Sequence, residues 1–186
     1  MARDLDGIRV AILLDTDFEQ VEMTEPRKAL EDAGARCVLV SPRKQVTGVK
    51  HDEKKDTFQV DQSLDTANPD DFDALLIPGG ALNADSLRVN QKAQEFVKSF
   101  DKNEKPMAII CHGPWLLVSA GLAKGRHLTS YHTIQDDLRN AGAQWEDSDV
   151  VSDRNWITSR QPSDIPAFNR EILNEWSKKL TGRNAA

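Results

Sequence analysis

Cysteine is scarce in this chain of 186 residues, which contains only Cys37 and Cys111. Two cysteines are too few for a disulfide framework, and free thiols are typical of a reducing compartment. We therefore expect a cytoplasmic protein. Cys37 lies in a strand-like apolar run, Arg36-Cys37-Val38-Leu39-Val40, and is interpreted as a structural residue.

Long hydrophobic runs and blocks of basic charge are also missing. The apolar runs fall far short of the roughly 18–20 residues that span a bilayer. The polar, acidic segment 1–7 is unlike a signal peptide. The chain has 24 basic and 30 acidic residues, a net charge of −6, and no basic cluster of the kind that binds nucleic acid. We expect no membrane insertion and no direct nucleic-acid binding.

Internal repeats, linkers and metal-binding histidine patterns are absent from the sequence as well. None of the four histidines has metal-ligand spacing with either cysteine, so we expect no bound metal. The length suits one domain with a proper core. We predict a single domain over residues 1–186, with its core at about 8–180.

What the chain does contain is an alternation of short apolar runs with amphipathic stretches. This pattern predicts an α/β fold with a doubly wound, mostly parallel sheet. The polar segment 43–60 is expected to form a peripheral hairpin or ribbon, and segment 81–88 a loop. The expected strands are 8–14, 37–40, 74–77, 106–111, 150–151 and 156–158, and the expected helices are 21–33, 91–100, 115–121, 133–141 and one that begins near 163–166.

Three polar or glycine-rich segments follow buried strands directly. They are Asp15 to Glu19, Pro78-Gly79-Gly80 and Cys111-His112-Gly113. Ligands bind outside the carboxyl ends of the strands in such sheets. We therefore expect the three segments to meet in one functional site.

Cys111 is the candidate nucleophile of this site. An apolar run ends at Cys111 and a helix-like segment follows, which is the layout of a nucleophile elbow. The nearby helix N-terminus should favour the thiolate. The backbone amides of His112 and Gly80 are the candidate oxyanion hole.

Acid–base partners for Cys111 can be sought on the neighbouring segments. Glu19 can reach the turn from the first strand, and His112 is the obvious base by adjacency, although consecutive side chains at a sharp turn point apart. Asp85 is a weak candidate to orient His112, and Tyr131 could line the pocket. We expect Glu22 to be exposed or to face a partner.

Several segments together resemble the PfpI (intracellular protease I) family of the ThiJ/PfpI superfamily. They include Phe18-Glu19-Gln20-Val21-Glu22, the run from Phe72 to Gly80, Ile110 to Pro114, and Ser159 to Asp164. The resemblance implies a flavodoxin-like three-layer α/β/α sandwich, similar to class I glutamine amidotransferases. It also implies a Cys111 nucleophile with His112 beside it, Glu19 hydrogen-bonded to the thiol, no cofactor, and a homodimer or higher homo-oligomer.

The resemblance leaves three functions open. The first is a stress-protective enzyme of the glyoxalase III or protein deglycase type, acting on a small carbonyl compound or a glycated substrate. The second is an intracellular cysteine peptidase, and the third is a non-enzymatic protein whose Cys111 senses oxidation. Asp85 stands where family proteases carry a triad glutamate, which weakens the peptidase interpretation. We expect the carbonyl-directed enzyme.

Overall fold

The computed structural model describes residues 4–181, and residues 1–3 and 182–186 of the predicted domain lie outside this part. Its centre is a seven-stranded sheet with the strand order β11-β12-β8-β7-β1-β3-β6. All neighbouring pairs are parallel except β11 and β12. The strands are β1 (Arg9–Leu13), β3 (Arg36–Ser41), β6 (Gln62–Ser63), β7 (Ala74–Ile77), β8 (Met107–Ile110), β11 (Val150–Asp153) and β12 (Trp156–Ser159).

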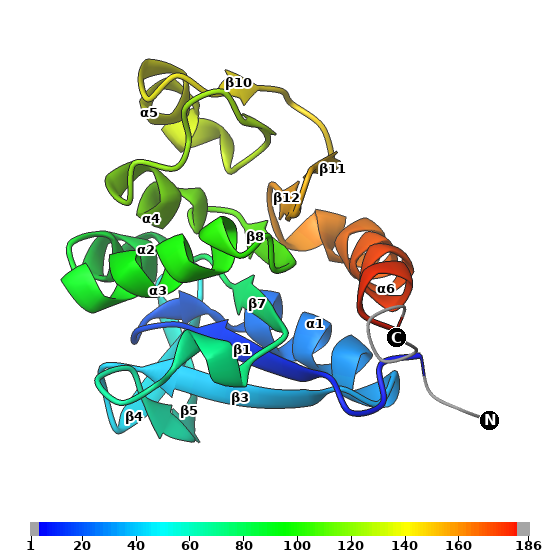
Figure 1. Cartoon of the computed structure of the whole chain (residues 1–186). Helices are drawn as coiled ribbons and strands as arrows, with labels where there is room; N and C mark the ends of the chain where they lie inside the picture. Colours follow the sequence, from blue (N-terminus) through cyan, green and yellow to red (C-terminus); the bar gives the residue numbers. More distant parts are fainter. Residues whose placement is uncertain (1–3, 182–186) are drawn as a thin grey trace.

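Helices cover both faces of this sheet, as Figure 1 shows. One core contains apolar residues of α1 (Gln20–Asp32) and α6 (Ile165–Thr181). The other contains those of α2 (Ala81–Arg88), α3 (Gln91–Lys102), α4 (Pro114–Ser119) and α5 (Gln135–Asn140). Alternate residues of β1 and β3 point into opposite cores because successive strand side chains face opposite ways. This confirms the predicted three-layer, mostly parallel sandwich.

The predicted peripheral hairpin is present beside the main sheet. β4 (Gln45–Lys50) and β5 (Glu53–Gln59) are antiparallel, and β4 also pairs with the short β2 (Phe18–Glu19). The hairpin therefore lies next to the segment that follows β1. A further two-stranded sheet joins β9 (His127–Leu128) to β10 (Gln144–Trp145), and 3-10 turns occupy η1 (Pro69–Asp71), η2 (His132–Ile134) and η3 (Pro162–Asp164).

One element differs from the prediction. Residues 81–88, expected to form a loop, make the helix α2. Asn83, Ala84 and Leu87 are buried on one side of this helix, and such packing outweighs the weak helix propensity of Asn, Asp and Ser. None of the helices described between residues 4 and 181 is long and apolar enough to cross a membrane.

Candidate functional site

The three predicted segments do meet at one edge of the sheet. β8, β7 and β1 are consecutive neighbours, so the segments that follow them lie side by side. They surround a cavity of about 330 Å³. The cavity is lined by Glu19, Glu22, His51, Gly80, Ala81, Cys111, His112, Tyr131, Gln161, Pro162 and Ser163.

Cys111 occupies a sharp turn between β8 and α4. Its φ angle of +64° is unusual for a residue with a side chain, and such backbone strain costs on the order of 1–3 kcal/mol. Two hydrogen bonds hold the turn: the Cys111 amide donates to the carbonyl of Ser159 at 3.0 Å, and the Tyr131 amide donates to the carbonyl of Cys111 at 2.9 Å. The surrounding structure therefore fixes the thiol at the cavity wall.

The Cys111 sulfur faces several hydrogen-bonding groups. The backbone amides of Gly80 and His112 both donate toward it. The Nδ1 atom of His112 lies 3.2 Å from Sγ, although consecutive side chains at a sharp turn were expected to point apart. Gly80 has a φ of +90°, and a Cβ there would lie 2.7 Å from the carbonyl oxygen of Asp17, so glycine is required at this position.

The carboxyl group that shares a hydrogen bond with the Cys111 thiol belongs to Glu22. Glu22 is fully buried in the first turn of α1, which corrects the expectation that it is exposed or faces a partner. Its Oε2 atom accepts a hydrogen bond from the Gly79 amide at 2.8 Å. Its Oε1 atom is buried without a nitrogen or oxygen partner among the described residues.

Glu19 also lines the cavity, but its hydrogen-bond partner is different from the one expected. Its Oε2 atom accepts a hydrogen bond from the backbone amide of His51, at the tip of the β4–β5 hairpin, at 2.9 Å. The structure therefore gives Glu22 the contact with the thiol that the sequence assigned to Glu19. The physical reason is local: Glu19 belongs to β2, whereas Glu22 lies on the buried side of α1, three residues farther along.

Glu22 and Cys111 form a buried acidic pair. Burial raises the pKa of Glu22 to about 8, and the nearby charge of Glu19 acts in the same direction. Burial, and then the charge of Glu22, raise the pKa of Cys111 well above its ordinary range, which is the opposite direction to the one expected from the helix N-terminus. A negative charge on the Glu22 carboxyl group disfavours a second negative charge on the neighbouring Cys111 sulfur. At neutral pH the pair therefore keeps at least one proton.

His112 is the other titratable group at the thiol. Burial lowers its pKa, and the neighbouring His132 acts in the same direction, so the ring is neutral at pH 7. Its Nε2 atom lies 3.4 Å from Thr133 Oγ1, and its ring lies 4.9 Å from the ring of Tyr131. His112 can thus accept a proton from the thiol or exchange one with a ligand.

The proposed orienting residue for His112 is not found in that position. Asp85 is exposed on α2, and His112 Nε2 contacts the hydroxyl group of Thr133 rather than a carboxylate. Tyr131, in contrast, does line the cavity as expected. Within residues 4–181 of one protomer, no carboxylate is bonded to His112 as an Asp or Glu of a catalytic triad would be.

Sequence reasoning missed two residues that shape the site. Asn83 is fully buried on α2 and donates to the carbonyls of Pro78 at 3.1 Å and Gly79 at 2.8 Å. It also accepts the amide of Asp15 at 2.6 Å, and so ties the end of β1 to the Gly79–Gly80 turn. His51 reaches the cavity from the hairpin. Neither position has a local sequence signal, because the contacts join segments far apart in the chain.

No metal cluster is found in the described chain: residues 4–181 contain no group of three or more His, Cys, Asp or Glu side chains placed to hold an ion. The cavity lining supplies the thiol of Cys111, the carboxyl groups of Glu19 and Glu22, the side chains of His51, His112 and Tyr131, and directed backbone amides.

Comparisons with known proteins connect this geometry to a family. Residues 8–175 match the model of the DJ-1/PfpI family. The "Putative cysteine protease YraA" of Bacillus subtilis is 45% identical over 168 residues, which cover 89% of this chain and 96% of that protein. The "Deglycase PfpI" of Pyrococcus furiosus is 42% identical over 166 residues, covering 89% and 98% of the two chains.

A solved structure shows the same architecture. It is a two-domain protein from Anabaena variabilis with DJ-1/ThiJ/PfpI-like and ferritin-like domains. The TM-score is 0.85 at 34% identity, and the match covers 90% of this chain and 48% of that one. The similarity therefore concerns one part of that longer protein.

Proposed function

Because the chain belongs to the DJ-1/PfpI family, we propose that it is a stress-protective, cysteine-dependent enzyme that acts on small reactive carbonyl compounds or on glycated side chains. The observation that supports this most directly is the buried Glu22–Cys111 pair, which keeps at least one proton beside two directed backbone amides. Such a pair supplies a sulfur nucleophile and, beside it, a carboxyl group that acts as general acid.

The first step places Cys111 in the role of an elbow nucleophile. The shared proton moves from the sulfur to Glu22 as the sulfur adds to the aldehyde carbon of methylglyoxal and forms a carbon–sulfur bond. The carbonyl oxygen receives the proton of Glu22, which yields a hemithioacetal. The amides of Gly80 and His112, which already point at the sulfur, stabilise the charge that develops on this oxygen.

The second step is a proton transfer between carbons. The Glu22 carboxylate removes the proton from the former aldehyde carbon, and a proton is returned to the neighbouring carbon through an enediol. The product is a thioester between lactate and Cys111, which water hydrolyses to lactate and free thiol. Neutral His112, 3.2 Å from the sulfur, can take the proton of the attacking water.

The cavity limits the substrate and gives Glu19 a separate role. A volume of about 330 Å³ lies at the small end of the roughly 300–1,000 Å³ of ligand pockets. It suits a short carbonyl compound or one glycated side chain. We propose that Glu19, held by the His51 amide, positions the substrate and keeps Glu22 protonated through its charge.

The decisive experiment measures methylglyoxal consumption without glutathione. Wild type should turn over, and Cys111→Ala should be inactive. Glu22→Gln should lose about two orders of magnitude in kcat, since it lacks the transferable proton, whereas Glu19→Gln should retain kcat within about tenfold and raise KM. Full turnover by Cys111→Ala would refute the proposal. Equal losses of kcat in Glu22→Gln and Glu19→Gln would refute the separate roles of the two carboxyl groups.

A cysteine peptidase is the second candidate, favoured by the contact between Cys111 Sγ and His112 Nδ1. Residues 4–181 of the protomer give His112 no carboxylate to orient it, so an acyl-transfer triad would need a residue from another subunit. Casein cleavage that Cys111→Ala abolishes would support this function. A homogeneous oligomer that leaves casein intact while consuming methylglyoxal would rule it out.

We also propose that the protein is a cytoplasmic homodimer or larger homo-oligomer. Leu82 on α2 and Val89 at its end are 65% and 78% exposed, and apolar side chains of this kind favour a subunit contact. Light scattering coupled to size exclusion tests this directly. A monomer at micromolar concentration would contradict the proposal.

A further inference from the structure

Three arginines meet at the edge of the sheet opposite the cysteine site. Arg9, Arg27 and Arg36 line a cavity of about 240 Å³ together with Cys37, Val38, Asp61 and Gln62. Arg9 and Arg36 begin β1 and β3, whereas Cys111 follows the end of β8. The arginine cavity, defined by these seven residues, is therefore separate from the catalytic cavity by about the length of the strands.

The strand register brings two of the positive charges together. Arg9 and Arg36 are direct partners on the parallel strands β1 and β3, which lie roughly 4.8 Å apart. Arg27 reaches the same cavity from α1. Like charges on neighbouring strands destabilise a sheet, so this arrangement needs a compensating group.

The protein itself supplies little compensation. Arg36 has no ion pair or side-chain hydrogen bond to any residue between 4 and 181. The Nε atom of Arg9 is buried without a partner among the same residues, and its guanidinium group lies 5.2 Å from the ring centre of Phe72. Arg27 uses only Nε, which donates to Glu31 at 2.8 Å.

The one acidic residue of the cavity is already engaged. An Asp61 carboxylate oxygen accepts the amide of Leu39 at 2.8 Å, and the Asp61 amide donates to the carbonyl of Leu39 at 3.1 Å. Cys37 is not a second anion, because burial raises the pKa of its thiol to about 12. Arg27 is thus paired with Glu31, whereas Arg9 and Arg36 line the cavity without an ion pair among residues 4–181, and the carboxylate of Asp61 is bonded to the backbone.

We propose that the arginine cavity binds a small anion through a phosphoryl group, either inorganic phosphate or the phosphate of a monoester. Guanidinium groups present paired donors that match phosphate oxygens. A dianion offsets the charge of Arg9 and Arg36, the two cavity arginines without an ion pair among residues 4–181. The volume lies below that of drug-sized ligand pockets, which fits a phosphoryl group rather than a whole nucleotide.

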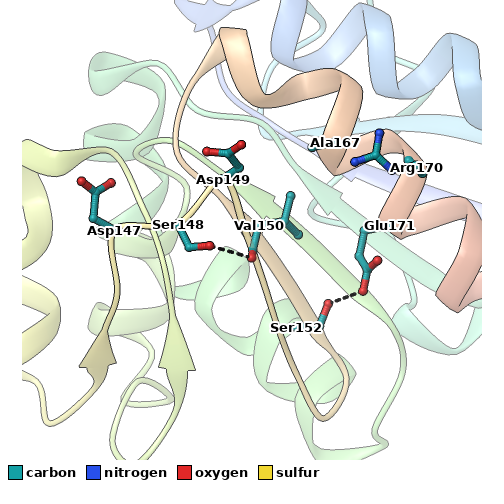
Figure 2. A pocket seen from close by; sticks show the side chains of 8 residues that line it. All are labelled: Asp147, Ser148, Asp149, Val150, Ser152, Ala167, Arg170 and Glu171. Atoms are coloured by element: carbon teal, nitrogen blue, oxygen red, sulfur yellow. Dashed lines mark hydrogen bonds between the residues drawn. The ribbon is translucent and has the colours of Figure 1, made fainter.

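The larger surface groove in Figure 2 also contains an arginine, and it serves as a comparison for the arginine cavity. It has a volume of about 630 Å³ and contains one arginine, Arg170, with Asp147, Asp149 and Glu171. Arg170 makes no ion pair within residues 4–181, but acidic side chains outnumber it in the groove. This groove lacks the charge to hold an anion, and Arg170 provides a matched control.

The test is titration calorimetry of the full chain with inorganic phosphate, at constant ionic strength set with sodium chloride. We expect saturable binding of one phosphate per chain. Arg36→Gln should weaken it at least about tenfold, as the loss of one charge-assisted contact does, and Arg170→Gln should change it less than twofold. Glycerol 3-phosphate forms a second arm: tighter binding than phosphate identifies a monoester as the ligand, and equal binding identifies free phosphate.

Stability measurements separate this role from a purely structural one. In phosphate-free buffer Arg36→Gln should melt at the same temperature as wild type or higher, because it relieves repulsion with Arg9. In about 20 mM phosphate only wild type and Arg170→Gln should gain stability, because a ligand that binds the folded state stabilises it. Absence of saturable binding to wild type, or unchanged binding to Arg36→Gln, would overturn the proposal.

Discussion

Replacing Glu22 with glutamine should remove a pH dependence from the stability of the fold. Burial raises the pKa of Glu22 from its ordinary value of 4.5 to about 8. Between these values the folded chain holds a proton that the unfolded chain has released. The contribution is fully present below pH 4.5 and is lost as the pH rises toward 8, at about 1.4 kcal/mol per pH unit.

The useful window lies between pH 6.5 and 8. Below it, His112 also titrates, because its pKa is lowered from 6.5. Over this window wild type should lose about 1.5 kcal/mol of unfolding free energy through Glu22, since the slope halves near pH 8. Glu22→Gln has no proton to release and should show no such loss.

Denaturant unfolding at pH 6.5, 7.25 and 8 measures the difference. Glu25→Gln is the matched control, because Glu25 lies on the same helix but is exposed, and it should keep the slope of wild type. If Glu22→Gln loses as much free energy over the window as wild type does, Glu22 is already ionised in the fold and the shared-proton pair does not exist.

Three further perturbations test the geometry of the site. Gly79→Ala would place a Cβ 2.5 Å from both Cys111 Cβ and Glu22 Oε2, so kcat/KM should fall by more than about tenfold, measured against an unchanged circular dichroism spectrum. Asn83→Ala leaves backbone carbonyls without their donor and should cost about 2 kcal/mol in denaturant unfolding; a loss below a few tenths would contradict its role. His112→Gln should remove a loss of stability that wild type shows as the pH falls below 6.5, because a lowered pKa means that the unfolded chain binds the proton first; melting temperatures at pH 5.5 and 7 decide this.

The candidate site illustrates where sequence information ends. Apolar runs and the order of a parallel sheet predicted three features of the site. These are the position of Cys111 after a buried strand, the Gly79–Gly80 turn and the meeting of three segments. The choice between Glu19 and Glu22 did not follow from these patterns, because both lie near the end of the same strand. Only the start of α1, with Glu22 on its buried side, decided which carboxyl group reaches the thiol.

The fold shows the same division. Periodicity predicted strand 74–77 with its observed bounds and most other strands and helices to within a few residues. It missed α2, whose polar composition favours a loop until Asn83, Ala84 and Leu87 are buried. Helix formation there depends on packing that a local pattern does not contain.

The sequence by itself determined the layered α/β architecture, the place of Cys111 directly after a buried strand and the absence of a disulfide framework, because these depend on composition and on short-range patterns. The tertiary structure decided which groups share a proton with Cys111 and how burial raises both pKa values. It also brought Arg9, Arg27 and Arg36 around one cavity. Such features depend on distances between segments far apart in the chain, and on desolvation, which only the packed molecule creates.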